Sequence, residues 1–155
     1  MESDILQKKK IIKLRRATIN DLPAIQRIER LSFRDPYPPY YTKALLESLA
    51  DISLIAEINE KIVGYIFSRI EYGDTGHIIS IAVDPRWRRR GIGKALMLEA
   101  MKLLKNAGCE SVYLEVRVSN HIAINLYRNL GFKIIKRIPR YYRDGEDAFL
   151  MQRSL

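Results

Sequence analysis

The chain has 155 residues, of which 47% are hydrophobic, and its 27 Lys and Arg exceed its 18 Asp and Glu, giving a formal net charge of +9. This length predicts one domain with a full hydrophobic core, and the apolar fraction excludes a chain that is disordered throughout. No apolar run approaches the roughly 18 residues of a membrane-spanning helix, so we expect no membrane partner.

The N-terminus and the single cysteine indicate where the protein works. Residues 1–10 lack the apolar core of a signal peptide, so we expect a cytoplasmic protein with a basic tail over 1–10 and one domain over 11–155. Cys109 is the only cysteine, which excludes an internal disulfide and a Cys-x-x-Cys metal site. The positive net charge favours anionic partners.

In chain order, residues 11–18 predict a strand, and Asn20 is expected to cap the helix that follows. Residues 33–41 then carry three prolines and three tyrosines. The three prolines exclude a helix here, and so many tyrosines are unusual in a linker, so we expect an aromatic loop that walls a peptide groove. A loop packed for stability alone is the alternative. Thr42 is expected to cap a short helix that ends at Ala50.

The middle of the chain predicts three strands. Residues 52–58 and 62–70 form a hairpin around a short turn. The third strand, 77–83, is nearly all apolar from Ile78 on and has the length of a strand buried on both faces. Asp84-Pro85 ends it, because proline cannot donate to a ladder and restricts the residue before it.

The second half predicts two helices, a strand between them and a final hairpin. The first helix begins at Gly91 and ends at Gly108, which suits the left-handed position of a C-cap. Strand 111–118 alternates in polarity, so Glu115 points away from its aliphatic face. The remaining elements are a helix capped by Ser119 or Asn120 and closed by Gly131, and strands over 133–138 and 148–152.

The segment between strand 77–83 and the helix at Gly91 has the features of an anion-binding loop. The first N–H groups of a helix have no internal acceptor and lie at the positive end of its dipole. Glycines at 91 and 93 let a phosphate approach these N–H groups, and three arginines at 88–90 add positive charge. A solvated basic turn before an ordinary helix is the alternative.

Two familiar phosphate loops do not match this segment. A Walker A loop requires Ser or Thr after its Gly-Lys, where this chain has Ala95, and a dinucleotide fingerprint requires a third glycine, where it has Leu96. The pattern that is present, Arg88-x-x-Gly91-x-Gly93, resembles the signature of the GNAT acetyltransferases.

This resemblance implies the GNAT fold, a single α/β (α+β) domain with a mixed, mostly antiparallel central sheet and helices on both faces. Strands 77–83 and 111–118 are expected to be parallel, because a long helix connects them, and to splay apart. The resemblance also implies acetyl-CoA as co-substrate and no metal. The residues expected to bind acetyl-CoA are Ile81, Ala82, Val83, Arg88, Arg89, Arg90, Gly91, Ile92, Gly93, Lys94, Asn120 and Tyr127.

Three further segments narrow the resemblance to protein N-terminal acetyltransferases. Asp35-Pro36-Tyr37, Leu114–Asn120 and Tyr141–Ala148 are similar to segments of the NatA catalytic subunit and of RimI-type ribosomal-protein alanine acetyltransferases. An archaeal enzyme ancestral to both types fits this combination best. One position departs from the pattern, because the NatA-type loop carries Glu where this chain has Asp35. The shorter carboxylate bears on which N-terminal residues are preferred.

Such a reaction needs a group that takes a proton from the amine. An α-amino group has a pKa of roughly 7.7–8.0, whereas attack on a thioester requires the neutral amine. The resemblance implies Glu115 as the base, with His77 sharing or assisting, and Tyr127 as the acid for the departing thiolate. A backbone N–H of strand 81–83 is the expected oxyanion donor. The residues expected to hold the peptide are Phe33, Asp35, Tyr37, Tyr141 and Tyr142.

Each of the three catalytic candidates also has a purely structural interpretation. Glu115 could form an ion pair with Arg117 or Lys133, and His77 could be a hydrogen-bonded histidine at a strand edge. Tyr127 could be a core aromatic on an amphipathic helix.

The predicted function is transfer of an acetyl group from acetyl-CoA to the free α-amino group of protein N-termini, on finished or nascent chains. Small first residues such as Ser, Ala and Thr are expected, with Met-Leu or Met-Glu as a second set. A GNAT acting on a small amine or on lysine is the alternative enzyme, which the two aromatic loops disfavour. A basic RNA- or ribosome-binding module is the alternative from another class, although the arginines gather at one turn and no RNA-binding motif appears. The sequence does not indicate whether an auxiliary subunit is required.

Overall fold

The computed structural model describes residues 11–155, so the expected basic tail over 1–10 lies outside the described residues. Seven strands form one sheet in the order β1-β2-β3-β4-β5-β7-β6. The strands are β1 (Lys13–Arg16), β2 (Ile52–Ile58), β3 (Lys61–Glu71), β4 (Thr75–Val83), β5 (Ser111–Arg117), β6 (Lys133–Ile138) and β7 (Ala148–Ser154). The helices are α2 (Leu22–Ser32), α3 (Pro39–Ala44), α4 (Ile92–Asn106) and α5 (His121–Asn129).

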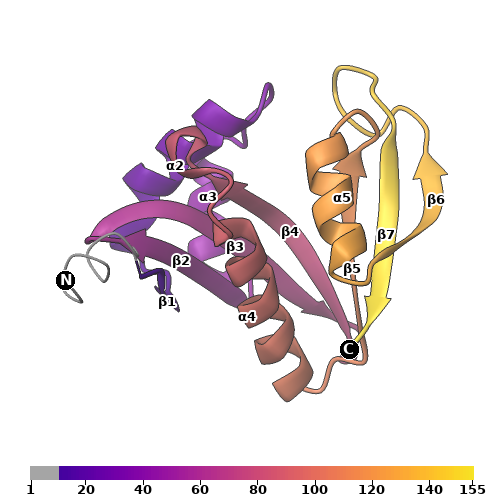
Figure 1. Ribbon diagram of the computed structural model, residues 1–155, viewed down its shortest axis with the longest axis horizontal. Coiled ribbons are helices and arrows are strands. Elements are labelled where there is room, and N and C mark those ends of the chain that lie inside the picture. Colours follow the sequence, from indigo (N-terminus) through magenta and orange to yellow (C-terminus); the bar gives the residue numbers. More distant parts are fainter. Residues whose placement is uncertain (1–10) are drawn as a thin grey trace, which may run out of the picture.

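The pairing of β4 with β5 confirms the expected splay. These two strands are the one parallel pair in the sheet, and α4 crosses over between them. Their pairing starts at Thr75 and Ser111 and ends at His77 and Tyr113, although both strands continue well beyond this point. Figure 1 shows β4 and β5 close together at one end and diverging toward the other. The sheet is therefore mixed, mostly antiparallel and opened along its middle.

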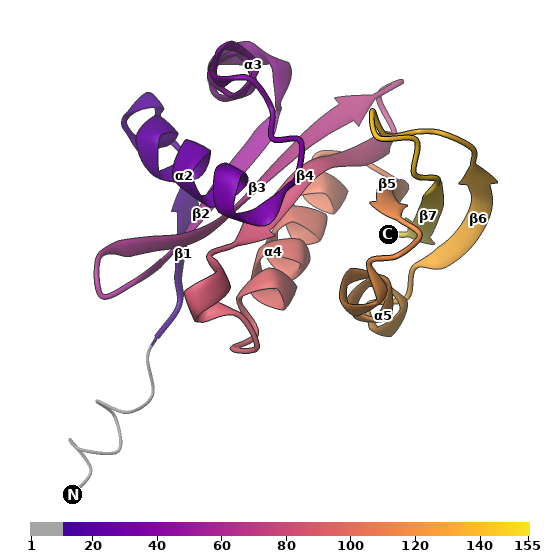
Figure 2. The same cartoon turned by 90° about the horizontal axis from the view of Figure 1, so that it is seen from above.

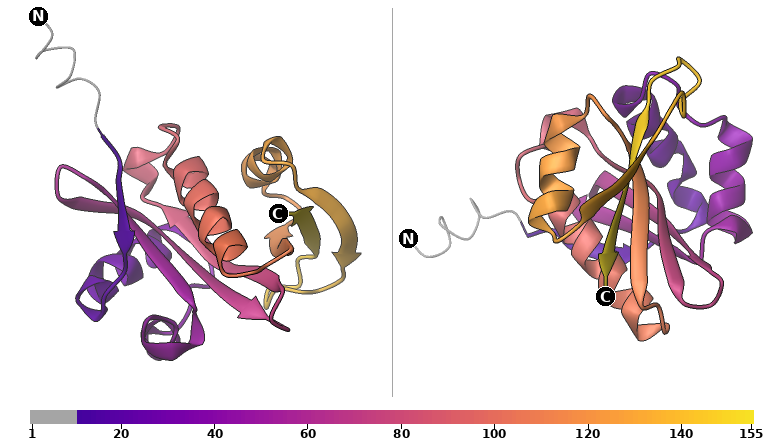
Figure 3. Two further views of the ribbon diagram at one scale, coloured as in Figure 1. Left: turned by 90° about the horizontal axis from the view of Figure 1, so that it is seen from below. Right: turned by 90° about the vertical axis from the view of Figure 1, so that its right-hand side faces the viewer.

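Helices cover both faces of the sheet, as expected. One face packs α2 and the turn after α3 on β3 and β4, and the other packs α4 and α5 (Figures 2 and 3). Each buried aliphatic side chain in these layers contributes roughly 1.5–3 kcal/mol relative to an exposed one. Among residues 11–155, no helix is both long and apolar enough to cross a membrane.

The first helix starts differently from the expectation. Asn20 lies inside a 3₁₀ turn, Ile19–Asp21, and Asp21 is the N-cap of α2. The Asp21 carboxylate accepts the Thr18 N–H at 2.7 Å and forms an ion pair with Arg15 at 2.7 Å. Asp21 rather than Asn20 therefore organises this turn, because its negative charge has a cation within reach.

The proline-rich segment contains the start of a helix. α3 begins at Pro39, with Pro38 as its N-cap, and Thr42 lies buried inside it rather than capping it. The expectation that the prolines exclude a helix here is wrong, because a proline at the first helical position lacks only an N–H that has no intrahelical acceptor. The aromatic loop is therefore shortened to residues 33–38. α3 continues into a π-helical turn, Leu45–Leu49.

A β-bulge in β4 decides which way its residues face. Opposite β3, Phe67 pairs with Ser80 and Ser68 pairs with Ile78, so Ile79 is an extra residue. Ile79 and Ser80 both contact side chains on the α2 face, whereas Ile81 packs against the α4 face. The apolar run in the sequence does not reveal this irregularity, because an extra isoleucine leaves the run unbroken.

Gly64 on β3 lets α4 approach the sheet closely. A Cβ atom at this position would lie 3.1 Å from the Ala82 carbonyl oxygen and 3.2 Å from Leu96 Cδ1. Both distances are tighter than ordinary contacts, so a side chain here would force its neighbours to move by a few tenths of an ångström. The first turn of α4, and with it the anion-binding loop, is thereby held against the middle of the sheet.

Candidate active site

The carboxylate of Glu115 meets the imidazole of His77 where β4 and β5 part. His77 is the last residue of β4 that pairs with β5, and Glu115 lies two residues beyond its partner Tyr113, on the same face of β5. The Nε2 atom of His77 lies 2.7 Å from Oε1 of Glu115. The two side chains are 15% and 14% exposed. A partly buried acid–base pair of this kind is able to accept a proton.

A second carboxylate, Glu71 at the end of β3, lies on the other side of the same imidazole. Its Oε2 atom is 3.3 Å from His77 Nδ1, in an alignment too poor for a hydrogen bond. Burial would raise the pKa of Glu71, but hydrogen bonds from Tyr113 and Arg69 outweigh it and hold the pKa below its usual range. The imidazole also stacks on Tyr113, with 4.3 Å between ring centroids. Glu71 is not among the residues predicted for the site, because no pattern in the sequence links it to a residue on another strand.

Tyrosines from two separate loops gather around Glu115. Tyr37 contacts Tyr41 edge-on at 4.7 Å between centroids, and Tyr141 contacts Tyr142 edge-on at 5.0 Å. Burial raises the pKa values of Tyr37, Tyr141 and Tyr142, and the nearby negative charge of Glu115 raises them further. Their hydroxyls therefore stay protonated at neutral pH and are available as hydrogen-bond donors.

Two ion pairs join the loops that carry these tyrosines. Asp35 lies 3.4 Å from Arg143, and Arg34 lies 3.8 Å from Asp144. All four side chains are exposed, so each pair contributes little to stability. Phe33, the first residue of the 33–38 loop, is also exposed. Tyr37, Tyr141 and Tyr142 form a tyrosine group, and Asp35 lies at its rim with its charge balanced by Arg143.

The structural alternative for Glu115 as a partner of Arg117 is wrong. Arg117 donates instead to Asp144 and Glu146, at 2.9 Å each, and its guanidinium lies 4.1 Å from the Tyr142 ring centroid. These contacts hold the loop between β6 and β7. Glu115 contacts His77 instead, and no ion pair of Glu115 with Lys133 occurs among residues 11–155.

The edge of β4 that faces away from β3 can accept an added strand. The Asp84 N–H donates to the Val63 carbonyl at 2.8 Å, so position 84 faces β3. Backbone groups alternate along a strand, so Ala82 faces β3 as well, and Ile81 and Val83 face the side on which β5 has diverged. The Val83 carbonyl accepts a hydrogen bond from Arg88 Nε at 3.1 Å, as this orientation requires.

The loop before α4 presents backbone N–H groups. Arg89 and Gly91 both adopt left-handed φ angles, +62° and +78°, and Gly91 is the N-cap of α4. A Cβ atom at Gly91 would meet nothing within 4 Å, so the loop leaves open space there. The first helical bond runs from Ala95 N–H to the Gly91 carbonyl at 3.0 Å. The N–H groups of residues 92–94 thus lie at the positive end of α4 without an intrahelical acceptor. These features fit a pyrophosphate.

The three arginines of the loop do not gather on one point. Arg88 donates to Val83 and lies 3.3 Å from Ser32 Oγ, whereas Arg90 stacks over Trp87 at 4.8 Å. Both guanidinium groups have such protein partners, so the backbone of the loop is its stronger anion-binding feature.

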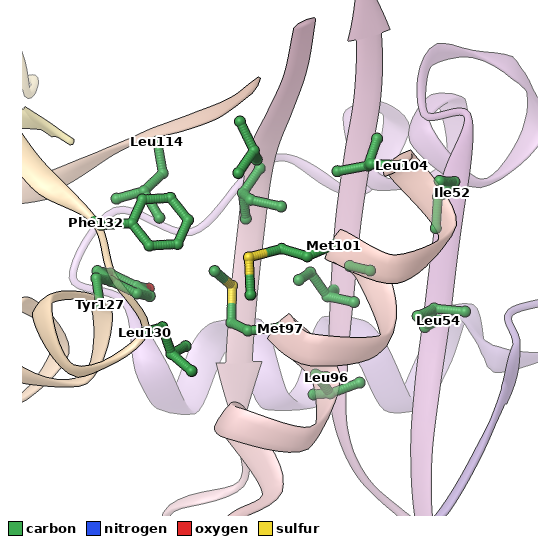
Figure 4. Close-up of a cluster of buried hydrophobic side chains, with 14 of the residues drawn as sticks. Ile52, Leu54, Leu96, Met97, Met101, Leu104, Leu114, Tyr127, Leu130 and Phe132 are labelled. Atoms are coloured by element: carbon green, nitrogen blue, oxygen red, sulfur yellow. The ribbon is translucent and has the colours of Figure 1, made fainter. Parts of the chain in front are cut away.

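Tyr127 lies across the sheet from Glu115. Its ring packs 5.9 Å from Phe132 in the α4-side cluster (Figure 4), and burial raises its pKa to about 12. Leu114 belongs to the same cluster and has the opposite orientation to Glu115 on β5. Tyr127 and Glu115 therefore approach the divergence of β4 and β5 from opposite faces.

Asn120 caps α5, and its Oδ1 accepts the Ala123 N–H at 3.2 Å. No group of three or more His, Cys, Asp or Glu within residues 11–155 is arranged to hold a metal ion.

Comparison with known proteins identifies the family. The Acetyltransferase (GNAT) family matches residues 22–132. An N-alpha-acetyltransferase of Sulfurisphaera tokodaii is 42% identical over an alignment of 167 positions, which covers 100% of both chains. The crystal structure of Ard1 from Thermoplasma volcanium superposes with a TM-score of 0.89 at 30% identity, covering 93% of this chain and 97% of that one. The ribosomal-protein-S18-alanine N-acetyltransferase from Escherichia coli gives a TM-score of 0.85 at 29% identity, covering 93% and 94%.

The chain belongs to the GNAT acetyltransferase family, and its relatives place it in the group of the N-alpha-acetyltransferases. The family resemblance seen in the sequence, including its Ard1/NatA-type and RimI-type character, is confirmed. The protein is accordingly an acetyltransferase, with acetyl-CoA dependence implied by the fold.

Proposed function

We propose that this protein acetylates the free α-amino group of protein N-termini, with Glu115 as the base, His77 assisting and Tyr127 on the leaving-group side. The observation that carries the proposal is the 2.7 Å contact of His77 with Glu115 at the point where β4 and β5 diverge. A group placed between the diverging strands would have this pair on one face of the sheet and Tyr127 on the other. We place the reaction in the cytoplasm, on finished or nascent chains.

Acetyl-CoA would supply the thioester, and the chain offers backbone groups to hold it. The N–H groups of residues 89–94 would bind the pyrophosphate, since two left-handed residues and a helix N-terminus form a concave donor surface there. Ile81 and Val83 would pair with the pantetheine like an added strand, after Arg88 releases the Val83 carbonyl. Asn120 uses its oxygen in the helix cap, so its amide NH₂ is the group left for the pantetheine.

Proton removal falls to the Glu115–His77 pair. An α-ammonium with a pKa of roughly 7.7–8.0 has to lose a proton before it attacks. Oε1 of Glu115 faces His77, so Oε2 is the oxygen that would accept this proton, directly or through a water. One backbone N–H of strand 81–83 would stabilise the charge that develops on the carbonyl oxygen, an effect worth about 10²–10³ in rate at other such sites.

Tyr127 would act as a hydrogen-bond donor rather than as a full proton donor. Its pKa is about 12, whereas an ordinary thiol has a pKa of about 8.5, so complete transfer of its proton to the thiolate is unfavourable. A hydrogen bond to the departing sulfur still lowers the barrier, because the negative charge appears only as the bond breaks.

The tyrosine group would hold the start of the peptide. Protonated hydroxyls of Tyr37, Tyr141 and Tyr142 would donate to the first carbonyls, and Phe33 and Asp35 would contact the first side chains. Loops converging from two directions suit a chain end better than a lysine within a chain. The proposed substrates are small termini such as Ser, Ala and Thr first, with Met-Leu and Met-Glu second.

A peptide panel tests the proposal. Labelled acetyl-CoA is supplied with peptides that vary in their first two residues and with a matched peptide whose N-terminus is blocked and whose sequence contains lysine. We expect turnover of free N-termini and none of the blocked control. Equal turnover of the blocked peptide would favour the lysine alternative and contradict the proposal.

A binding assay separates the enzyme from the RNA-binding alternative. The protein is titrated with acetyl-CoA and with a structured RNA at two salt concentrations. We expect saturable acetyl-CoA binding at both. Tight RNA binding that falls steeply with salt, without acetyl-CoA binding, would support the RNA module instead.

A further inference from the structure

Glu29 on α2 is a buried carboxylate that the proposed reaction does not use. Its side chain points to the sheet and is 3% exposed. Oε2 accepts the backbone N–H of Tyr37 at 2.6 Å. Oε1 accepts a hydrogen bond from the Tyr65 hydroxyl, and Ser80 Oγ lies 3.5 Å away. The carboxylate therefore joins α2, the 33–38 loop, β3 and β4.

Glu29 differs from the other buried carboxylates in having no cation beside it. Asp21 pairs with Arg15, and Asp84 pairs with Arg27 at 3.1 Å. Glu29 forms no ion pair within residues 11–155 and is satisfied by neutral donors alone. A buried charge in this situation is costly unless each of its hydrogen bonds is kept. The hydrogen-bond donors around the Glu29 carboxylate therefore have to stay in fixed positions.

The fixed partners of the carboxylate include one end of the aromatic loop, at Tyr37. The Phe33 N–H donates to the main-chain carbonyl of Glu29 at 3.0 Å, while the Tyr37 N–H donates to its side chain. Tyr37 lies between Pro36 and Pro38, which have no N–H, so its amide is the one donor of this Pro-Tyr-Pro run. The ion pairs that connect this loop to the β6–β7 loop are exposed and weak. Glu29 is therefore the main anchor of the loop.

The Glu29 carboxylate also contacts Ser80 on β4, the strand that is proposed to bind the pantetheine. Ser80 follows the bulge residue Ile79 and precedes Ile81, whose backbone faces the open edge of β4. Glu29 thus relates the position of Tyr37 to that of Ile81 through one side chain.

We infer that Glu29 is a positioning residue for the acceptor peptide. It holds Tyr37, one of the residues proposed to bind the peptide, at a set distance from β4. The inference rests on the proposed function, in that the bound acceptor is the start of a peptide. The predicted effect is selective, because the acetyl-CoA contacts on residues 89–94 lie outside the loop that Glu29 holds.

The test compares Glu29→Gln with Asp21→Asn, a matched loss of a buried carboxylate near the other end of α2. A glutamine removes the negative charge and replaces one of the two acceptor oxygens by an NH₂ donor, so it cannot accept both the Tyr37 N–H and the Tyr65 hydroxyl proton at the positions of Oε2 and Oε1. We expect Glu29→Gln to raise the peptide KM about tenfold or more, as loss of a charged hydrogen bond would, with the KM for acetyl-CoA changed less than threefold. Asp21→Asn is expected to lower Tm and to leave both KM values within threefold. Equal rises of both KM values in Glu29→Gln, or no rise, would overturn the inference.

A readout that needs no activity separates this inference from the proposed function. Amide hydrogen exchange by NMR in the wild-type protein should show the Tyr37 amide exchanging at least a hundredfold more slowly than those of Arg34 and Asp35 in the same loop. Glu29→Gln should accelerate exchange at Tyr37 at least tenfold, and Asp21→Asn should not. A Tyr37 amide that exchanges as fast as its neighbours in the wild type would overturn the inference even if the variant fails to fold. Protection at Tyr37 without peptide turnover would instead count against the proposed function alone.

Discussion

His77 Nε2 lies 2.7 Å from Glu115 Oε1, across the last position at which β4 and β5 remain paired. The two residues are 38 positions apart in the sequence and meet because β4 and β5 are paired in parallel. Removing either side chain changes the surroundings of the other, so the effects of the two changes are not expected to add.

The first prediction concerns this pair. Glu115→Gln is expected to cost more in kcat than His77→Ala, and the double variant far more than either, because each residue partly covers the loss of the other. Loss of a base typically costs about 10²–10⁴ in rate. The measurement is kcat against pH for all variants, with folding checked by circular dichroism. Wild-type kcat across pH 6–9 in Glu115→Gln and in the double variant would show that the pair is structural.

The second prediction concerns the anion-binding loop. Gly91→Glu and Gly93→Glu are expected to raise the acetyl-CoA KM sharply, because a carboxylate would stand where the pyrophosphate binds. Gly73→Glu is the matched control for Gly91, since Gly73 has φ +79° and equally open surroundings in a turn between β3 and β4. This control should carry the same backbone strain and leave the KM unchanged. Unchanged kinetics in both loop variants would rule the site out.

The third prediction concerns Tyr127. Tyr127→Phe removes one hydroxyl and keeps the ring against Phe132. It is expected to lower kcat while leaving the Kd for acetyl-CoA within about twofold, because the hydroxyl acts only as the thiolate departs. Kinetics and equilibrium binding on the same preparation provide the measurement. A raised Kd with unchanged kcat would instead indicate a role in binding.

The fourth prediction concerns stability against pH. Hydrogen bonds from Arg86, supported by Arg27, hold the pKa of Asp84 at about 2, below the ordinary value of 3.8. The folded-state pKa is lower than the unfolded one, so the stabilisation is complete above about pH 4 and is lost as the pH falls toward 2. Both arginines are partly exposed, so we expect a loss of order 1–2 kcal/mol.

Denaturant unfolding from pH 5 to pH 2 measures this loss. Asp84→Asn removes the titrating group, so its free energy of unfolding should fall less steeply over this range than that of the wild type. Identical slopes for the two proteins would contradict the assignment.

Much of the architecture was open to prediction because it depends on local patterns. Alternation along 111–118 was enough to turn Glu115 away from the aliphatic face of β5, and the long helix between two strands required them to be parallel. The spacing of Arg88, Gly91 and Gly93 predicted an anion-binding loop, and the structure places these residues before and in the first turn of α4. Each of these conclusions needs only the residues within one element and its neighbours.

The sequence by itself therefore determined the class of fold, the order of its elements and the side of β5 on which Glu115 lies. The tertiary structure decided the contacts that depend on register between distant strands. It placed Glu71 beside His77 and inserted the bulge at Ile79. A shift of one residue in pairing would move these side chains to the other face, and no local pattern specifies that pairing. The helix starting at Pro39 was missed for a local reason, because a proline is compatible with the first position of a helix.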